Sequence, residues 1–505
     1  DIGLRRDTER LSLTASYDFG DYNLAAIVAR NSQGANWVRD LDLTDRIGWF
    51  SRDPQRLKDE SYELRLTGPQ DGRFRWLAGI NYYEQEFFSS GQGGTAGTGC
   101  ISFVSAVLTD DPATCLPTTL VFPNSLADAD EAEVLGLFAA ADFDLNDQWT
   151  AIAEFRYQDD TFRKGGGLVR EGQPVLEESF TDLLPRLILR YQPSDTTTLF
   201  VSYAEGQIAG EFNAFFINAD QREREQYLAQ DPKVSEALPA EKLEAWEFGW
   251  KQTLLDGRVQ MNFAAYTNEW SNAKGRSSFA INETCRASDF AASTPGCDPG
   301  LGQVVGSPKQ IADPNTGELV PFFNTRNILI PGDARIRGLE FETLLRPSDT
   351  FTVQASLTYI DSKYKDYEFN FVEPFAGFKQ MAGNQTPRQP KWSGNLALTK
   401  FFNVAGFDAF VRTDMIYQGR AFVDESNLAY IDDYMLMNLR GGIETDRYRV
   451  ELFVRNVLNE DAWATGARWT DFSSPFQGTF FTAKQGVAVS PQDKREIGLR
   501  FNLRL

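Results

Sequence analysis

The 505-residue sequence contains no histidine. This absence removes histidine-based metal ligation, histidine general-base catalysis and a histidine ligand for haem. Carboxylate pairs such as Glu340 and Glu342, and the acidic stretch Asp128–Glu131, fit solvated surfaces better than acid–base catalysis or a Ca²⁺ site. We therefore expect no catalytic residue, no metal and no cofactor, and we do not expect an enzyme.

Long apolar runs are also missing, since no stretch approaches the ~18 uncharged apolar residues of a transmembrane helix. Mean hydropathy is −0.38. A helical membrane protein is thereby excluded, whereas a transmembrane β-barrel is not, because only every second residue of its strands faces lipid. Aromatic residues make up 13% of the chain, which fits the aromatic girdles of such barrels.

Basic residues are outnumbered, with 50 Lys and Arg against 71 Asp and Glu and a net charge of −21. Nucleic-acid binding needs cations to neutralise phosphates, so we expect no nucleic-acid partner.

Cysteine is scarce: the four residues are Cys100, Cys115, Cys285 and Cys297. They form two close pairs, each within a long polar segment, and we expect both pairs to be disulfides in an oxidising compartment. Each such bond is worth roughly 3 kcal/mol in the chain-entropy model. The alternative, a zinc site made by all four, lacks the CxxC spacing such sites use.

What the sequence has in abundance is alternating polar and apolar segments joined by turns and loops. Eight short turns are predicted at 18–21, 69–72, 146–147, 193–195, 256–257, 347–349, 405–406 and 445–446. Eight long polar loops alternate with them, at roughly 32–60, 89–131, 163–179, 208–241, 272–332, 365–390, 418–432 and 459–494. The alternation implies about 17 strands, with short turns in the periplasm and long loops outside the cell.

Single strands show which side chains face lipid. In Phe351–Tyr359 the odd-numbered residues are apolar and the even-numbered ones are polar. The predicted lipid face continues in Val450, Leu452 and Val454 and in the last strand, and the charged residues between them face the interior. The outward set of the last strand is Ile497, Leu499, Phe501, Leu503 and Leu505.

The number of predicted strands implies that further sequence lies upstream. An open sheet cannot span a bilayer, and single-chain bacterial barrels have an even number of strands. About 17 strands is odd, and Asp1 opens directly into strand-like sequence without a signal peptide. We expect about 22 strands in the whole barrel.

Several segments, in order along the chain, resemble TonB-dependent outer-membrane receptors: Tyr62–Ile80, Val201–Asn213, Leu243–Lys251, Arg337–Glu342, Val454–Glu460 and Arg495–Phe501. Two features depart from the family pattern: the chain ends in Leu505 rather than an aromatic residue, and the plug domain with its TonB-contacting segment is absent from this sequence. Residues 1–505 are therefore interpreted as a partial receptor barrel, an all-β transmembrane antiparallel fold, without the plug and the first strands.

The resemblance implies an outer-membrane receptor that binds a scarce nutrient and imports it with TonB energy. An iron–siderophore complex is the favoured cargo, and a carbohydrate or another nutrient is the alternative. Expected partners are TonB through the plug, outer-membrane lipid and lipopolysaccharide, the small nutrient ligand, and a possible surface lipoprotein. Three other classes stay open: a passive porin, a barrel enzyme, which the lack of histidine disfavours, and a barrel that serves as a subunit of a surface complex with a lipoprotein lid.

Candidate ligand contacts come from aromatic and charged residues in predicted external loops, which suit stacking and cation–π recognition. Packing of the loops against the wall is the competing interpretation for each residue. The candidates are Trp37, Arg39, Trp49, Glu211, Phe212, Asn213, Arg468 and Trp469.

Overall fold

The computed structural model describes residues 3–40, 49–89, 92–95, 100–102, 107–109, 130–164, 176–291, 296–313, 316–470 and 485–503. Its main sheet has 18 strands, one of which, the four-residue β5 (Gln92–Thr95), only extends the edge of β3. The remaining 17 follow one another in chain order, each antiparallel to the next. They are β1 (Gly3–Phe19), β2 (Tyr22–Asp40), β3 (Trp49–Thr67), β4 (Phe74–Ser89), β8 (Asp130–Asp144), β9 (Trp149–Lys164), β10 (Leu176–Ser194), β11 (Thr197–Ile208), β12 (Glu241–Leu254), β13 (Val259–Ile281), β16 (Asn324–Ser348), β17 (Phe351–Asp366), β18 (Trp392–Val404), β19 (Phe407–Gln418), β22 (Tyr434–Glu444), β23 (Tyr448–Arg455) and β26 (Glu496–Leu503).

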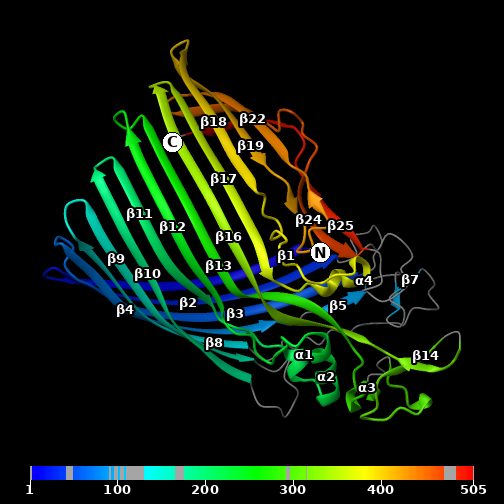
Figure 1. The fold of residues 1–505 in the computed structure, drawn as a ribbon. Helices are drawn as coiled ribbons and strands as arrows, with labels where there is room; N and C mark the ends of the chain where they lie inside the picture. The colour runs from blue at the N-terminus through cyan, green and yellow to red at the C-terminus, as the bar shows by residue number, and fades with distance from the viewer. Residues whose placement is uncertain are drawn as a thin grey trace.

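Figure 1 shows these strands side by side in a curved wall, with the helices gathered at one end and the short turns at the other. Within the described chain, the two outermost strands, β1 and β26, are not paired with each other. The predicted antiparallel barrel-type sheet of about 17 strands is confirmed. No helix in the described part of the chain is both long and apolar enough to cross a membrane.

All eight short turns predicted from the sequence lie between consecutive long strands. The turn after β18 is typical: Ala405 and Gly406 have φ angles of 51° and 86°. Two consecutive left-handed residues are what a two-residue hairpin needs, because its twist then matches that of the flanking strands.

The eight long connections are also where they were predicted, but several are shorter than expected. The segment 32–60 was predicted as a loop, yet β2 continues to Asp40 and β3 begins at Trp49, in register from Asn23↔Thr67 to Asp40↔Phe50. Likewise β13 and β16 stay paired out to Ile281↔Asn324. These extensions lack the lipid-facing alternation that marks a spanning strand, so the sequence pattern does not reveal them.

The two faces of the wall carry the side chains that the alternation predicts, with apolar residues on the outer face and polar residues on the inner face. Residues opposite each other in the ladders share a face, and Leu357 pairs with Phe341 while Leu452 pairs with Leu499. Large apolar side chains on this outer face remain exposed, at 48% for Leu357 and 70% for Leu499. A continuous exposed apolar surface of this kind requires a non-aqueous surrounding. Leu505 lies outside the described residues.

Aromatic rings border this apolar band at both of its edges. On the side of the short turns, Trp149 stacks on Tyr191 with ring centroids 4.4 Å apart. On the side of the long loops, Tyr203 contacts Trp246 at 4.9 Å and Tyr359 contacts Trp392 at 4.7 Å. Such paired girdles mark the two membrane–water interfaces of a transmembrane barrel.

Short elements fold the long connections. The helices are α1 (Ala214–Ile217), α2 (Gln221–Gln230), α3 (Ala287–Ala291) and α4 (Glu373–Ala376), with 3₁₀ turns η1 (Pro299–Leu301) and η2 (Asn370–Val372). Small two-stranded sheets pair β6 (Cys100–Ser102) with β7 (Val107–Thr109), β14 (Gln310–Ala312) with β15 (Leu319–Pro321), β20 (Ala421–Phe422) with β21 (Tyr430–Ile431), and β24 (Trp463–Thr470) with β25 (Gln485–Pro491).

Candidate functional site

The connections after β11 and β13 fold into one unit at the extracellular end of the wall, here called the loop assembly (209–240, 282–291, 296–313 and 316–323). Helix α2 begins with a capping box, in which the Asp220 carboxylate accepts from the Glu223 backbone N–H and Glu223 returns the bond. The helix packs Tyr227 against Phe279 and Phe216 in a buried apolar cluster. The loop assembly therefore shares a small core with the extracellular ends of β13 and β16, and Figure 1 shows α1 and α2 beside this end of the wall.

Asn213 ties this assembly to the wall. Its side-chain amide donates to the carbonyl oxygens of Leu329, at 2.8 Å, and Ser235, at 2.9 Å. Its amide oxygen accepts from the Leu329 N–H at 2.8 Å. Since Asn213 is only 3% exposed, these hydrogen bonds satisfy an otherwise costly buried amide.

A buried charge network holds the second connection. The Glu283 carboxylate, 8% exposed as a residue, faces Lys309 at 3.1 Å and accepts hydrogen bonds from Asn324 and Arg326. Lys309 also lies 3.3 Å from Asp289. Burial alone would raise the pKa of Glu283, but the hydrogen bonds and charges of Arg326 and Lys309 outweigh burial and hold it below its usual range.

A disulfide joins Cys285 to Cys297 across twelve residues of the same connection. Both cysteines are buried, at 1% and 3% exposure. The sequence prediction for this pair is confirmed. The predicted Cys100–Cys115 bond lies outside the described residues, because Cys115 and the side chain of Cys100 are not described.

A second cluster joins the last three long connections. Arg468, on β24, forms an ion pair with Asp424 at 3.0 Å. Its guanidinium also lies over the rings of Phe369, at 5.1 Å, and Phe371, at 5.3 Å. Burial raises the pKa of the neighbouring Glu425 carboxyl. Aromatic, cationic and acidic groups thus meet at one point of the extracellular side.

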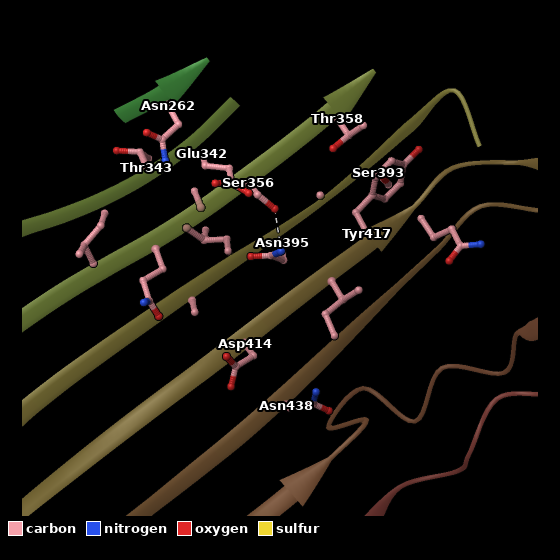
Figure 2. A pocket seen from close by; sticks show the side chains of 18 of the residues that line it. Asn262, Glu342, Thr343, Ser356, Thr358, Ser393, Asn395, Asp414, Tyr417 and Asn438 are labelled. Atoms are coloured by element: carbon pink, nitrogen blue, oxygen red, sulfur yellow. Dashed lines mark hydrogen bonds between the residues drawn. The ribbon is translucent and has the colours of Figure 1, made fainter. Parts of the chain in front are cut away.

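The inner face of the wall carries a polar hollow of about 820 Å³ beside β13, β16, β17, β18, β19 and β22. Figure 2 shows amide, hydroxyl and carboxylate side chains reaching into it from neighbouring strands. Asn395 donates to Ser356 at 2.7 Å, and Arg412 pairs with Asp414 at 2.7 Å. The hollow offers amide and hydroxyl groups for hydrogen bonding, and two of its three charged side chains, Arg412 and Asp414, pair with each other. It therefore suits a polar surface or solute.

The structure places the eight candidate contacts on three segments. Trp37 lies on β2 and is 45% exposed. Arg39 and Trp49 lie on β2 and β3, but their side chains are outside the described residues. Glu211 accepts the Leu238 N–H through its backbone oxygen, at 2.7 Å, and Phe212 bridges Ala237, so these two and Asn213 form one anchored stretch.

Arg468 and Trp469 lie on β24, and Trp469 is 36% exposed. Sequence reasoning missed the partners of Arg468, namely Phe369, Phe371 and Asp424. The Phe-x-Phe spacing within the predicted loop 365–390 was a usable signal, since it puts two rings in one short connection. Nothing local in the sequence links that loop to Arg468.

Comparison with known proteins adds independent evidence. The family model described as "TonB dependent receptor-like, beta-barrel" matches residues 2–457. Among solved structures, the ferric yersiniabactin uptake receptor FyuA from Yersinia pestis is 14% identical, with a TM-score of 0.63, over 99% of this chain and 61% of that one. BauA, the ferric preacinetobactin receptor from Acinetobacter baumannii, is 13% identical, with a TM-score of 0.61, over 99% of this chain and 62% of that one.

The unliganded ferric citrate transporter FecA is 13% identical, with a TM-score of 0.63, over 99% of this chain and 62% of that one. This chain therefore spans about three fifths of the length of each of these structures. Identities this low show a shared fold, and the family match rests on the sequence itself. The chain belongs to the TonB-dependent receptor β-barrel family, an outer-membrane family of receptors and transporters rather than enzymes.

Proposed function

We propose that the protein binds an iron–siderophore complex at its extracellular side and imports it with energy supplied by TonB. The family match carries this proposal. The similar structures named above support the choice of cargo, since two are receptors for ferric siderophores and the third transports ferric citrate.

The geometry gives this proposal a place for the ligand. Arg468 lies over the rings of Phe369 and Phe371, and the next residue of β24, Trp469, is 36% exposed. Such groups stack on aromatic and planar ligands. Arg468, Trp469 and Trp37, with Arg39 and Trp49, are the proposed ligand contacts. Asn213, with Glu211 and Phe212, is proposed to hold the loop assembly in place for ligand binding.

The partners follow from the same proposal. TonB would act through a plug domain within the complete protein, and the exposed outer face of the wall would contact outer-membrane lipid and lipopolysaccharide. A surface lipoprotein covering the loops is a further proposed partner, and its copurification with the receptor would identify it.

Uptake of radioactive iron tests the function. A deletion strain, complemented with the complete gene, would be supplied with a panel of ferric siderophores under iron limitation. We expect one siderophore to restore uptake in a TonB-dependent manner, and Trp469→Ala to weaken uptake while surface abundance stays unchanged. An exposed tryptophan away from this cluster, Trp463→Ala, is the matched control because it is 49% exposed on the same strand.

A carbohydrate cargo is the second candidate, favoured by the amide and hydroxyl lining of the inner hollow. Growth on a panel of oligosaccharides, lost on deletion of the gene and of TonB, would support it and contradict the siderophore proposal. Uptake that persists without TonB would contradict both and indicate a passive channel.

A further inference from the structure

The loop assembly contacts the segment between β17 and β18, here called the β17 connection (367–391), at the C-terminal end of α2. Lys233 of the loop assembly pairs with Asp366, the last residue of β17, at 2.8 Å. Lys379 of the β17 connection reaches the other way, since its Nζ donates to the carbonyl oxygen of Gln230, the last residue of α2, at 3.1 Å. A cation at this end of a helix offsets the helix dipole, so the contact stabilises the docked helix.

Asp231 follows α2 directly and is 2% exposed. Its Oδ1 accepts a hydrogen bond from the Lys233 backbone N–H at 2.8 Å. Its Oδ2 is buried and accepts no hydrogen bond from the described part of the chain. A buried carboxylate oxygen without a partner is costly, and the cost falls once the carboxyl group holds a proton.

The charges around Asp231 do not remove this cost. The charged side chains of this region are Lys233, Asp366, Glu368, Glu373 and Lys379. Both lysines are already engaged, Lys233 with Asp366 and Lys379 with Glu368 at 2.9 Å. Burial raises the pKa of Asp231 and the Glu368 carboxylate adds to the rise, while the Lys233 N–H and the two lysine charges offset it only in part.

The β17 connection also supports Arg468, one of the proposed ligand contacts. Glu368 directly precedes Phe369, whose ring centroid lies 5.1 Å from the Arg468 guanidinium. The Phe369 N–H donates to the carbonyl oxygen of Lys379 at 2.7 Å. Lys379 and Glu368 therefore fix the position of the ring that Arg468 lies over.

We propose that Asp231 is a proton-responsive positioning residue, whose uptake of one proton tightens the docking of α2 against the β17 connection and thereby holds Phe369 beneath Arg468. Its link to ligand binding rests on the proposed function, whereas the docking itself does not.

The effect of pH is opposite to that of a salt-bridged carboxylate. Because docking raises the pKa of Asp231, the ionised carboxylate weakens docking above that pKa. The weakening disappears as pH falls through the raised pKa toward the ordinary value of 3.8, so mild acid tightens the contact.

Hydrogen exchange of the complete protein in detergent, from about pH 7 to about pH 4.5 and corrected for intrinsic exchange, tests the proposal. In the parent, exchange of Gln226–Val234 and Phe369–Lys379 should slow about threefold or more as pH falls over this range. Asp231→Asn keeps the shape of the side chain and lacks its charge, so both segments should exchange slowly at every pH. Glu225→Gln is the matched control, because Glu225 is an exposed carboxylate on α2 that bonds Gln221, and it should keep the pH dependence of the parent.

Heat-dependent gel mobility shows which variants are folded. If Asp231→Asn does not fold, Glu368→Gln decides the question together with the parent. Removing the Glu368 charge lowers the pKa of Asp231, so the step in exchange should move to lower pH.

A step that persists in Asp231→Asn would assign the proton to another group and overturn the proposal. Exchange in the parent that stays constant or speeds up as pH falls would also overturn it, as would a step that Glu368→Gln leaves in place. No cargo takes part in these measurements, so a failure of the siderophore proposal would leave their outcome unchanged.

Discussion

At the scale of single residues, the buried polar side chains of the loop assembly bind backbone groups and oppositely charged side chains rather than solvent. Asn213 uses both ends of its amide on backbone groups of Leu329 and Ser235. The sequence predicts Asn213 as a candidate ligand contact, because it lies in the segment Val201–Asn213 that resembles the receptor family. Its partner Leu329 is 116 positions away, and no local pattern could have named it.

We predict that Asn213→Ala will loosen the loop assembly by about 1–3 kcal/mol, because it leaves the Leu329 N–H buried without a partner. Hydrogen exchange of the segments around α2 and Leu329 measures the change. Gln221→Ala is the control, since Gln221 is exposed and bonds only Glu225 among the described residues. Equal exchange in both variants would show that Asn213 does not hold the assembly.

Glu283 makes the assembly sensitive to acid. Because its folded pKa is held below its usual range, its contribution is complete above its ordinary value of 4.5 and is lost as pH falls through the folded pKa. We predict that hydrogen exchange of Asn324–Arg326 will accelerate as pH falls below about 4.5, after correction for the intrinsic pH dependence of exchange. Glu283→Gln should remove the acid-dependent step, and a step that persists would assign the acid dependence to another group.

At the scale of elements, the sequence predicts strands well and their extracellular ends poorly. Alternation located all 17 long strands and the eight turns between them, because lipid contact forces every second residue to be apolar. Above the membrane that constraint ends, and β2 and β3 continue through polar residues without alternation, such as Asn36, which lies opposite Pro54, and Gln55, which lies opposite Ala35. Helix α2 was also missed, since its capping box lies in a segment that was treated as one loop.

The two faces of β17 give a matched pair of substitutions. We predict that Leu357→Lys will cost about 2–4 kcal/mol and reduce the folded protein in the outer membrane, because it puts a charge in lipid. Thr358→Lys, one position along, faces the inner hollow and should assemble normally. Surface abundance and heat-dependent gel mobility measure both variants, and equal assembly would contradict the assigned faces.

The disulfide belongs to the connection between β13 and β16. We predict that replacing Cys285 and Cys297 together with serine will destabilise this connection by roughly 3 kcal/mol in the chain-entropy model. Limited proteolysis should then cut between residues 282 and 323 while the strands stay protected. Cleavage spread through the strands would instead show that the bond stabilises the whole wall.

At the scale of the whole molecule, the dominant feature is that β1 and β26 each have one edge with no strand partner among the described residues. Open edges cannot lie in hydrocarbon, because their N–H and C=O groups would have no partner. We predict that residues 1–505 expressed alone will not give a heat-modifiable barrel, whereas the complete protein will. A stable barrel formed by residues 1–505 would show that β1 and β26 can close on each other.

The long β13–β16 hairpin sets how far the receptor projects from the cell. Above Leu339, the last exposed apolar residue on the outer face of β16, the strand continues to Asn324 for 339 − 324 = 15 positions, or about 51 Å of strand at ~3.4 Å per residue. The disulfide-bonded part of the loop assembly follows the end of this hairpin, since Cys285 comes four residues after the last residue of β13, Ile281. We therefore expect antibodies and phages that approach the bacterium to find this disulfide-bonded part of the receptor within reach.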